Sequence, residues 1–155
     1  MTDYDLICRE LYELSDGIDY DITILSNASA LLYAELDRLN WAGFYLFREG
    51  ELKLGPFQGK PACTVIKPGK GVCGTAAAED RTVLVPDVHK FPGHIACDSA
   101  SESEIVVPVH VRGGLYGVLD IDSPFKNRFS DEDRAGIEMF VKVLEGRLAL
   151  TGINE

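Results

Sequence analysis

Apolar and polar positions repeat along the chain with two periods, which predict helices near both ends and short strands between them. Apolar residues recur every three or four positions in Tyr4–Leu14, in Asp19–Asp37 and after Ser130, as in amphipathic helices. Elsewhere they alternate by two between turn-forming residues, as in strands. Strands are therefore predicted at Trp41–Arg48, Glu51–Leu54, Ala62–Ile66, Thr82–Val85, Glu104–Val111 and Leu115–Asp122, with a loop at Gly55–Pro61 and a short helix at Val72–Glu79.

The order of these elements predicts an α+β fold. The strands come in runs joined by tight turns such as Arg112–Gly114, and helices stand at either end and in the middle. Hairpins with flanking helices are typical of a central antiparallel sheet with helices packed on it. The chain has 155 residues, and domains usually span ~100–200 residues, so a single domain over residues 1–155 is expected.

The Asp19–Asp37 helix has a narrow apolar seam that leaves its packing partner open. The seam positions step by four and three: Ile18, Ile22, Leu25, Ser29, Leu32 and Leu36. Such a seam is typical of contact with a partner helix. A helix that covers one face of its own sheet fits the pattern equally well.

Composition and charge exclude some classes of function. The chain is 46% hydrophobic and 26% charged, as in an ordinary globular protein, and its net charge is −10. Nucleic acid and anionic membranes both need a basic partner, so neither is expected to bind. Met1–Asp5 lacks the features of a secretion signal, and no apolar run approaches the ~20 residues of a membrane span. A cytoplasmic location is therefore expected.

The four cysteines then need individual roles, because cytoplasmic disulfides are rare unless they are transient or catalytic. Cys8 lies in the apolar stripe of the first helix and is interpreted as structural. Cys97 lies on a loop of turn-forming, polar and acidic residues just before a strand, where a scaffold presents reactive groups. Cys73 stands at the start of the short helix, where the helix dipole lowers a thiol pKa. It would equally well fill a small gap between helix and sheet.

Two further patterns carry little weight. Three of the cysteines, with His94 or His89, could supply zinc ligands, but no Cys-x-x-Cys pair supports such a site and no bound metal is expected. Gly69–Gly74 matches the dinucleotide fingerprint G-x-G-x-x-G without the long preceding strand or the acidic residue that this use requires. No bound cofactor is expected, and these glycines are interpreted as a tight turn.

A pair of acids ends the last predicted strand. Asp120 and Asp122 lie two residues apart, so both side chains are expected on one face, ~6.5–7 Å apart. Tyr116 and Val118 share that face. Like charges in a pocket push one pKa upward, which makes a general acid at neutral pH, and Glu104 on the neighbouring strand could join them. Two solvated acids at a strand end are the equally open alternative.

The first predicted strand is rich in aromatic residues. Period two places Trp41, Gly43, Tyr45 and Phe47 on one face and Ala42, Phe44 and Leu46 on the other. Core packing is the default role of Trp41 and Tyr45, and the wall of a pocket is the functional one.

Seven segments carry residues that are distinctive when taken together. They are Asn40–Tyr45, Leu54–Gly59, Ala62–Cys63, Gly71–Gly74, Phe91–Asp98, Ser103–Val106 and Gly117–Ser123. With them the chain resembles the free methionine-(R)-sulfoxide reductases, single-domain enzymes of the GAF fold, roughly from Leu25 to the final helix. A GAF resemblance alone would imply little, because the fold serves many sensors. Three cysteines at these positions make it specific.

The resemblance implies roles for the cysteines and names two partners. Cys97 corresponds to the catalytic cysteine of the family, Cys63 to its principal resolving cysteine and Cys73 to a second one. It also implies free methionine sulfoxide as substrate, thioredoxin as external reductant and a homodimer, which would suit the seam on the Asp19–Asp37 helix.

The resemblance also implies the residues of the substrate pocket. Trp41 corresponds to the tryptophan of that pocket, and Tyr45, Ile95 and Ala96 are expected to lie beside the substrate. The acidic residues of the family correspond to three positions of this chain: Glu104, Asp120 and Asp122.

The implied chemistry agrees with the residue types. A sulfoxide sulfur becomes electrophilic once its oxygen is protonated, and Glu104 with Asp122 would supply that proton. The Cys97 thiolate would attack the sulfur, release methionine and become a sulfenic acid. Cys63 would condense with it to a disulfide, which an external dithiol exchanges away. The carboxylates, chiefly Asp120, would hold the substrate ammonium, and Trp41 would pack the S-methyl group.

Two rival functions belong to other classes. A non-catalytic GAF module would bind a small molecule and signal through helices, but the chain carries no recognisable output domain, and such a sensor needs no loop-positioned thiols. A redox or metal sensor would use the same cysteines with a histidine. A zinc assay on the purified protein separates this last function from the others.

Overall fold

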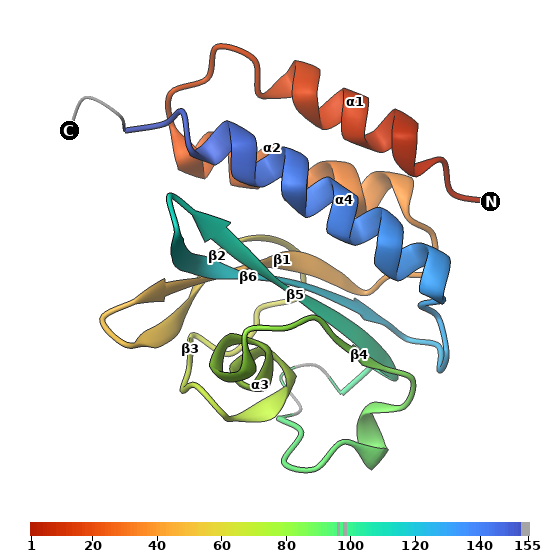
Figure 1. Ribbon diagram of the computed structural model, residues 1–155. Coiled ribbons are helices and arrows are strands. Elements are labelled where there is room, and N and C mark those ends of the chain that lie inside the picture. The colour runs from red at the N-terminus through yellow and green to blue at the C-terminus, as the bar shows by residue number, and fades with distance from the viewer. Residues whose placement is uncertain (96, 98, 153–155) are drawn as a thin grey trace.

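A computed structural model describes residues 1–95, 97 and 99–152 (Figure 1). Its elements are α1 (Tyr4–Leu14), α2 (Asp21–Glu35), β1 (Trp41–Arg48), β2 (Glu51–Gly59), β3 (Val65–Ile66), α3 (Gly71–Glu79), β4 (Val83–Val85), the 3-10 helix η1 (Val88–Lys90), β5 (Ser103–Val111), β6 (Gly114–Ser123) and α4 (Asp131–Leu148). The strands form one six-stranded sheet in the order β3-β2-β1-β6-β5-β4. Every neighbouring pair is antiparallel, so the predicted α+β fold with a central antiparallel sheet is confirmed.

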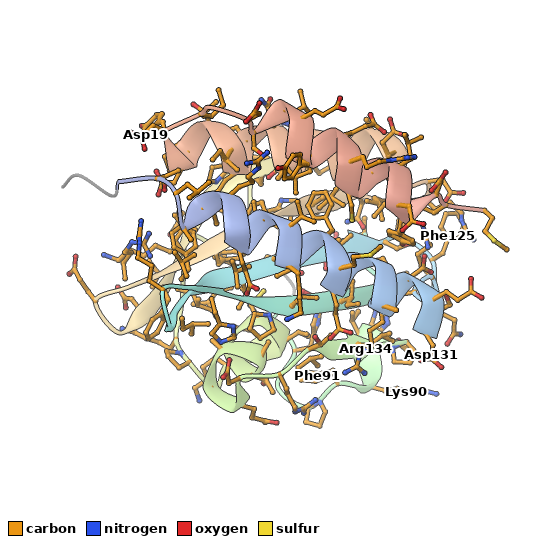
Figure 2. All side chains as sticks on the ribbon, turned by 45° about the horizontal axis from the view of Figure 1, so that its top comes forward. Asp19, Lys90, Phe91, Phe125, Asp131 and Arg134 are labelled. Carbon is orange, nitrogen blue, oxygen red and sulfur yellow. A yellow bond between two sulfur atoms is a disulfide. The ribbon has the colours of Figure 1, made fainter. Side chains whose placement is uncertain are left out.

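The sheet is covered on both faces, by different kinds of structure. Figure 1 shows α1, α2 and α4 as a layer on one face, whereas α3 and the loops around it lie on the other. The side chains drawn in Figure 2 fill the space on each side of the sheet. None of the helices in the described part of the chain is long and apolar enough to cross a membrane.

Each face of the sheet has its own apolar core. The helix-face core joins the buried residues of α1, α2 and α4 to seven sheet residues, Ala42, Phe44, Ile105, Val107, Val109, Leu119 and Ile121. The α3-face core consists of Trp41, Tyr45, Leu52, Ile66, Val72, Cys73, Ala76, Val83, Val85, Val88, Val106 and Val118. Because strand side chains alternate between faces, consecutive residues of one strand enter different cores. The alternation predicted for β1 is confirmed.

Strand β2 is longer than its sequence pattern predicts. The prediction ended it at Leu54 and made Gly55–Pro61 a loop, but the strand continues to Gly59. Gly43 pairs with Phe57 and Tyr45 with Leu54, so two residues of β2 face one residue of β1. This is a β-bulge, one of the few places where a sheet accepts a proline such as Pro56. The strand predicted at Ala62–Ile66 shrinks to Val65–Ile66.

Helix α2 packs on its own sheet, which decides between the two interpretations of its seam. Its buried residues include Leu25, Ser29 and Leu32 from the seam, and also Ile24, Ala28 and Leu31 beside it. Ile22, another seam residue, is exposed. The buried stripe is therefore wider than a coiled-coil seam, as expected of a helix that covers a sheet. The helix is also shorter than the predicted Asp19–Asp37, because Leu36 already has extended backbone angles.

A second bulge moves Tyr116 away from the face predicted for it. Val109 pairs with Gly117 and His110 with Leu115, which leaves Tyr116 as an extra residue in β6. Its ring packs against the helix-face core. Its hydroxyl donates a hydrogen bond of 2.6 Å to Asp21 at the start of α2. Val118, beyond the bulge, keeps its predicted place in the α3-face core.

Helix α4 begins as the sequence predicts and is tied to α1. The Ser130 hydroxyl accepts a hydrogen bond from the Asp133 backbone N–H, and the Asp133 side chain accepts one from Ser130 in return, which is a capping box. The Tyr4 hydroxyl donates to the same Asp133 carboxylate at 2.6 Å. One turn on, Gly136 is so close to the Tyr4 ring that a methyl group there would lie 2.2 Å from a ring carbon.

We expect Gly136→Ala to destabilise the protein by ~1–3 kcal/mol, the usual cost of forcing extra volume into a packed contact. At Gly146, in the same helix, an added methyl group would have no neighbouring atom within 4 Å. Gly146→Ala should therefore stabilise by ~0.5–1 kcal/mol through helix propensity alone. Denaturant unfolding of both variants measures the two values. Equal effects at the two positions would contradict the assigned contact between α1 and α4.

Candidate active site

The cysteine-bearing loop between η1 and β5 begins and ends at one anchored point. The Val88 backbone N–H donates to the Glu102 carbonyl at 2.9 Å, which joins the two ends of the loop. Asp87 caps η1 by accepting a hydrogen bond from the His89 backbone. Cys97 lies within this loop, half-buried, and forms a disulfide with Cys63, with 5.5 Å between the Cα atoms. The resemblance predicted that these two cysteines act as a pair.

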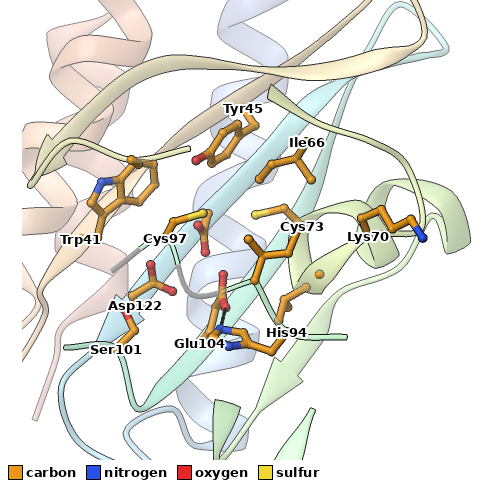
Figure 3. A pocket seen from close by; sticks show the side chains of 15 residues that line it. Trp41, Tyr45, Ile66, Lys70, Cys73, His94, Cys97, Ser101, Glu104 and Asp122 are labelled. Atoms are coloured by element: carbon orange, nitrogen blue, oxygen red, sulfur yellow. Dashed lines mark ion pairs between the residues drawn. The ribbon is translucent and has the colours of Figure 1, made fainter. Parts of the chain in front are cut away.

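A small cavity of about 40 Å³ lies beside Cys97 and is lined by residues of β1, β5, β6 and α3 (Figure 3). Fifteen residues line it: Trp41, Tyr45, Ala62, Ile66, Lys70, Gly71, Val72, Cys73, His94, Ile95, Cys97, Ser101, Glu104, Asp120 and Asp122. A single water needs ~10–15 Å³ on this measure. The cavity therefore holds a few water molecules at most.

The three predicted acids meet at the pocket because of the strand register. Glu104 of β5 pairs directly with Asp122 of β6, and Asp120 follows two residues earlier on the same face. The exposed fractions of Glu104, Asp120 and Asp122 are only 6%, 6% and 9%. The alternative of two solvated acids at a strand end is therefore wrong.

Burial and mutual repulsion keep protons on this acidic cluster. Loss of solvation, together with the neighbouring charges of Asp120 and Asp122, raises the pKa of Glu104 well above its usual range. Burial also raises the pKa of Asp120, although hydrogen bonds from Glu104 and Cys73 oppose that rise. Glu104 is therefore the group of the cluster best suited to hold a proton at neutral pH and to donate it.

Cys73 lies in the same cluster, and its predicted acidity is wrong. Its side chain is 4% exposed, in the first turn of α3. Burial, followed by the charges of Asp120, Glu104 and Asp122, raises the pKa of the Cys73 thiol well above its usual range. The helix dipole that motivated the prediction is outweighed by this desolvation and by the adjacent carboxylates. Cys73 thus fills the gap between helix and sheet while its sulfur faces the pocket.

An aromatic stack forms another wall of the pocket. Trp41 stacks on Phe57 and Tyr45, with ring centroids 5.2 Å and 5.9 Å away. Its indole N–H donates to the Lys60 carbonyl at 3.1 Å, which fixes the ring. The Tyr45 hydroxyl donates to the Cys63 carbonyl at 2.9 Å. Tyr45 therefore lines the pocket and also anchors the segment that carries Cys63.

The loop contributes a histidine that the sequence suggests only as a zinc ligand. His94 lines the pocket, and its Nε2 lies 3.9 Å from Oε1 of Glu104 (Figure 3). Burial lowers its pKa, so the neutral ring is favoured. Ile95, as predicted, lines the pocket, where it lies over Gly71 at the start of α3. Ala96, also predicted beside the substrate, lies outside the described residues.

Comparison with known proteins identifies the family. The GAF domain model matches residues 5–148. The free methionine-R-sulfoxide reductase of Escherichia coli (strain K12) is 52% identical over 143 residues, which cover 92% of this chain and 87% of that protein. The chain belongs to the free methionine-(R)-sulfoxide reductase family of GAF domains.

Solved structures of this family share the fold closely. The reduced form of fRMsr of Staphylococcus aureus has a TM-score of 0.93 and 53% identity, covering 96% of this chain and 97% of that one. Free methionine-R-sulfoxide reductase from Neisseria meningitidis, in complex with its substrate, has a TM-score of 0.91 and 40% identity. The match covers 96% of this chain and 89% of that one.

In this family member, almost all the residues expected at the site from the resemblance gather around one cavity. Cys73, Cys97, Glu104, Asp120, Asp122, Trp41, Tyr45 and Ile95 all line it, and Cys63 reaches it through the disulfide. Cys8 is buried in the helix-face core, on the other side of the sheet, as expected of a structural cysteine.

The raised pKa of Glu104 predicts a pH-dependent stability. Folded Glu104 keeps its proton at pH values where the unfolded residue, with a pKa of ~4.3, has lost it. The folded state then binds more protons, so its stability falls as pH rises above that value. Glu104→Gln removes this pH dependence, because glutamine does not titrate. The free energy of unfolding of the variant, relative to that of the wild type, should therefore rise by about 1.4 kcal/mol per pH unit until the pKa of folded Glu104 is reached.

Urea unfolding of the disulfide-bonded protein between pH ~4.5 and ~8 measures this difference. Glu13→Gln, at an exposed position of α1, is the matched control and should show no such trend. A stability difference for Glu104→Gln that is constant with pH would mean that the folded carboxyl is already ionised.

Proposed function

We propose that this protein reduces free L-methionine (R)-S-oxide to L-methionine, with Cys97 as the nucleophile. The observation that carries the proposal is a cysteine pair, Cys63 and Cys97, beside a pocket that contains buried carboxyl groups, among which burial and neighbouring charges raise the pKa of Glu104. A thiol that attacks sulfur and an acid that protonates oxygen are the two groups this reduction needs. Membership of a family with named free methionine-R-sulfoxide reductases supports the same substrate.

Recognition of the free amino acid would rest on the acidic cluster. A substrate ammonium placed between Asp120 and the other carboxylates would pair with charge that the fold has already buried. Only the ammonium would then lose solvation on binding, and a substrate without it would leave the buried charge unpaired. The stacked ring of Trp41 offers an apolar surface for the S-methyl group. Because an ammonium exists only on the free amino acid, a methionine sulfoxide within a peptide would lack this interaction.

The chemical step consumes one proton and leaves an oxidised cysteine. The Cys97 thiolate attacks the sulfoxide sulfur while Glu104, assisted by Asp122, protonates the oxygen. The oxygen passes to Cys97 as a sulfenic acid, and methionine leaves with its sulfur reduced. Cys63 then attacks that sulfenic acid, and the products are the Cys63–Cys97 disulfide and one water molecule. The disulfide in the structure corresponds to this end point.

The cycle closes with an external dithiol, for which we propose thioredoxin. Cys63 and Cys97 are only half-buried, so an exchanging thiol can reach them. Cys73 would act as a second resolving thiol, and its raised pKa suits a reserve role better than a primary one. Thioredoxin recycling suits a reducing compartment, so we also propose a cytoplasmic location. The homodimer suggested by the family resemblance remains a prediction.

Cys97→Ser should reduce turnover to the background rate while the fold is kept, because the variant lacks the nucleophile and the residue lies in a loop. The assay is NADPH consumption with thioredoxin and thioredoxin reductase, with methionine R-sulfoxide as substrate. Cys8→Ser, at a buried position on the other face of the sheet, is the control and should keep the wild-type kcat. Near-normal turnover by a folded Cys97→Ser protein would sink the proposed mechanism.

The enzyme should also prefer the free amino acid to its N-acetylated form. Acetylation removes the ammonium charge and leaves the carboxylates without their partner, a loss of ~3–5 kcal/mol for a buried pair. We therefore expect kcat/KM to fall on the order of 10²–10⁴-fold, with no activity on the S epimer. Comparable rates for the two compounds would show that the acids do not recognise the ammonium.

The alternative function is a non-catalytic GAF sensor, and the same assays distinguish it from a reductase. Binding of methionine sulfoxide without formation of methionine, by a fully reduced protein, would favour a sensor.

A further inference from the structure

Donor atoms converge in the pocket in a way that an amino-acid substrate does not require. Sγ of Cys73 and a carboxylate oxygen from each of Glu104 and Asp120 all lie within 4.8 Å of one another. All three residues are more than nine-tenths buried. Ammonium binding would use the carboxylates alone. A thiol together with carboxylates is also a ligand set for a metal ion, which is a different kind of occupant.

One buried oxygen of this cluster lacks a partner. Oδ1 of Asp120 is inaccessible to solvent and accepts no hydrogen bond from any residue in the described part of the chain. Buried polar atoms are nearly always satisfied, and leaving a carboxylate oxygen unsatisfied is costly. A cation placed between Asp120, Glu104 and Cys73 would satisfy it.

The cavity fits an ion better than an amino acid. It has a volume of about 40 Å³ in the disulfide-bonded state, whereas one water needs ~10–15 Å³ on the same measure. A metal ion with one or two waters fits this space. Methionine sulfoxide is too large for this space in the disulfide-bonded state.

The donor set selects the class of metal. Calcium and magnesium prefer oxygen ligands alone, and copper(I) prefers soft ligands alone. One thiolate with carboxylates suits zinc, whose bonds to sulfur and oxygen are ~2.3 Å and ~2.0–2.2 Å long. Two such ligands on a tetrahedral ion lie ~3.3–3.7 Å apart, so the donor atoms would need to approach one another by at most about 1 Å. His94 is the nearest candidate for a fourth ligand, because its Nε2 lies 3.9 Å from Glu104.

We propose that Cys73, Glu104 and Asp120 form a zinc site on the floor of the pocket, completed by His94 or a water. The set differs from the zinc ligands considered from the sequence, because Cys63 and Cys97 bind each other and only Cys73 contributes sulfur. Zinc at this position occupies the carboxylates that would hold the substrate ammonium and proton. On the proposed function, zinc is therefore a reversible inhibitor that competes with methionine sulfoxide.

Cobalt(II) is the spectroscopic probe for the binding site. In disulfide-bonded protein with Cys8→Ser, Cys73 is the only free thiol. Titration with Co²⁺ should show one equivalent bound and a thiolate-to-cobalt charge-transfer band, both reversed by Zn²⁺. A further Cys73→Ser change should abolish the band and lower the affinity for Co²⁺ at least ~10-fold. Even the loss of a residue that only hydrogen-bonds to a metal ligand lowers metal affinity by that factor.

Two further variants keep the test decisive. His110→Gln removes a surface histidine that lies between Asp80 and Glu145, one alternative metal-binding group, and should leave cobalt affinity unchanged. Asp120→Asn should keep the charge-transfer band but weaken binding by ~10-fold or more, and it serves if Cys73→Ser does not fold. The proposal is overturned if no cobalt binds, if the band survives Cys73→Ser, or if His110→Gln alone removes it.

The inhibitory role needs a separate assay, because it rests on the proposed function. Pre-reduced protein, freed of small thiols, receives one equivalent of Zn²⁺ and then methionine R-sulfoxide, and methionine is measured after a single turnover. Zinc should lower the yield of methionine, and a chelator should restore it. For a Cys73→Ser protein the yield should be the same with zinc as without it. Equal inhibition of both proteins overturns this role. No methionine without zinc refutes the reductase function instead, and leaves the cobalt result to decide the site.

Discussion

The structure depends on three carboxyl groups that share a buried space where β5 and β6 pair. Glu104 and Asp122 face each other across the ladder, and Asp120 stands one pleat away. Little water reaches them, and burial together with the charges of the neighbouring carboxylates raises the pKa of Glu104 well above its usual range. Two regular antiparallel strands hold the side chains in fixed positions, which a mobile loop would not do.

The two faces of the sheet serve different purposes: one carries the larger apolar core, and the other carries the pocket. The helix-face core contains almost only apolar side chains and ties α1, α2 and α4 to the strands. The α3-face core is smaller, and the pocket with its polar groups is built into it. Strand β1 serves both, since Phe44 enters one core and Tyr45 the other. A strained or destabilised site can therefore persist because the opposite face holds the sheet together.

Local patterns in the sequence were enough to predict most elements and their faces, because periodicity reports burial directly. The alternation in β1 and the capping signal at Ser130 are examples. The predictions failed where the local structure depends on a contact with residues far away in the sequence. Nothing near Pro56 shows that β2 continues past it through a bulge, and nothing near Tyr116 reveals the extra residue in β6. The acidity of Cys73 was misjudged because the helix start is visible in the sequence, whereas Asp120 approaches it from another strand.

The site residues were reached mainly through the family resemblance, and their assembly depends on register. The role of Tyr45 beside Cys63 has no sequence signal, because the two residues lie 18 positions apart. They meet because the chain after β2 turns back along Leu54, which pairs with Tyr45. The Cys63–Cys97 disulfide joins residues 34 positions apart and encloses β3, α3, β4 and η1. A cross-link that closes a loop of that length lowers the entropy of the unfolded chain. In the chain-entropy model this stabilises the folded state by about 4 kcal/mol. On the proposed mechanism this bond opens in every catalytic cycle, so the protein would alternate between a more stable disulfide-bonded form and a less stable reduced form. The reducing conditions that this mechanism needs would thus also be those in which the protein is most exposed to unfolding and proteolysis.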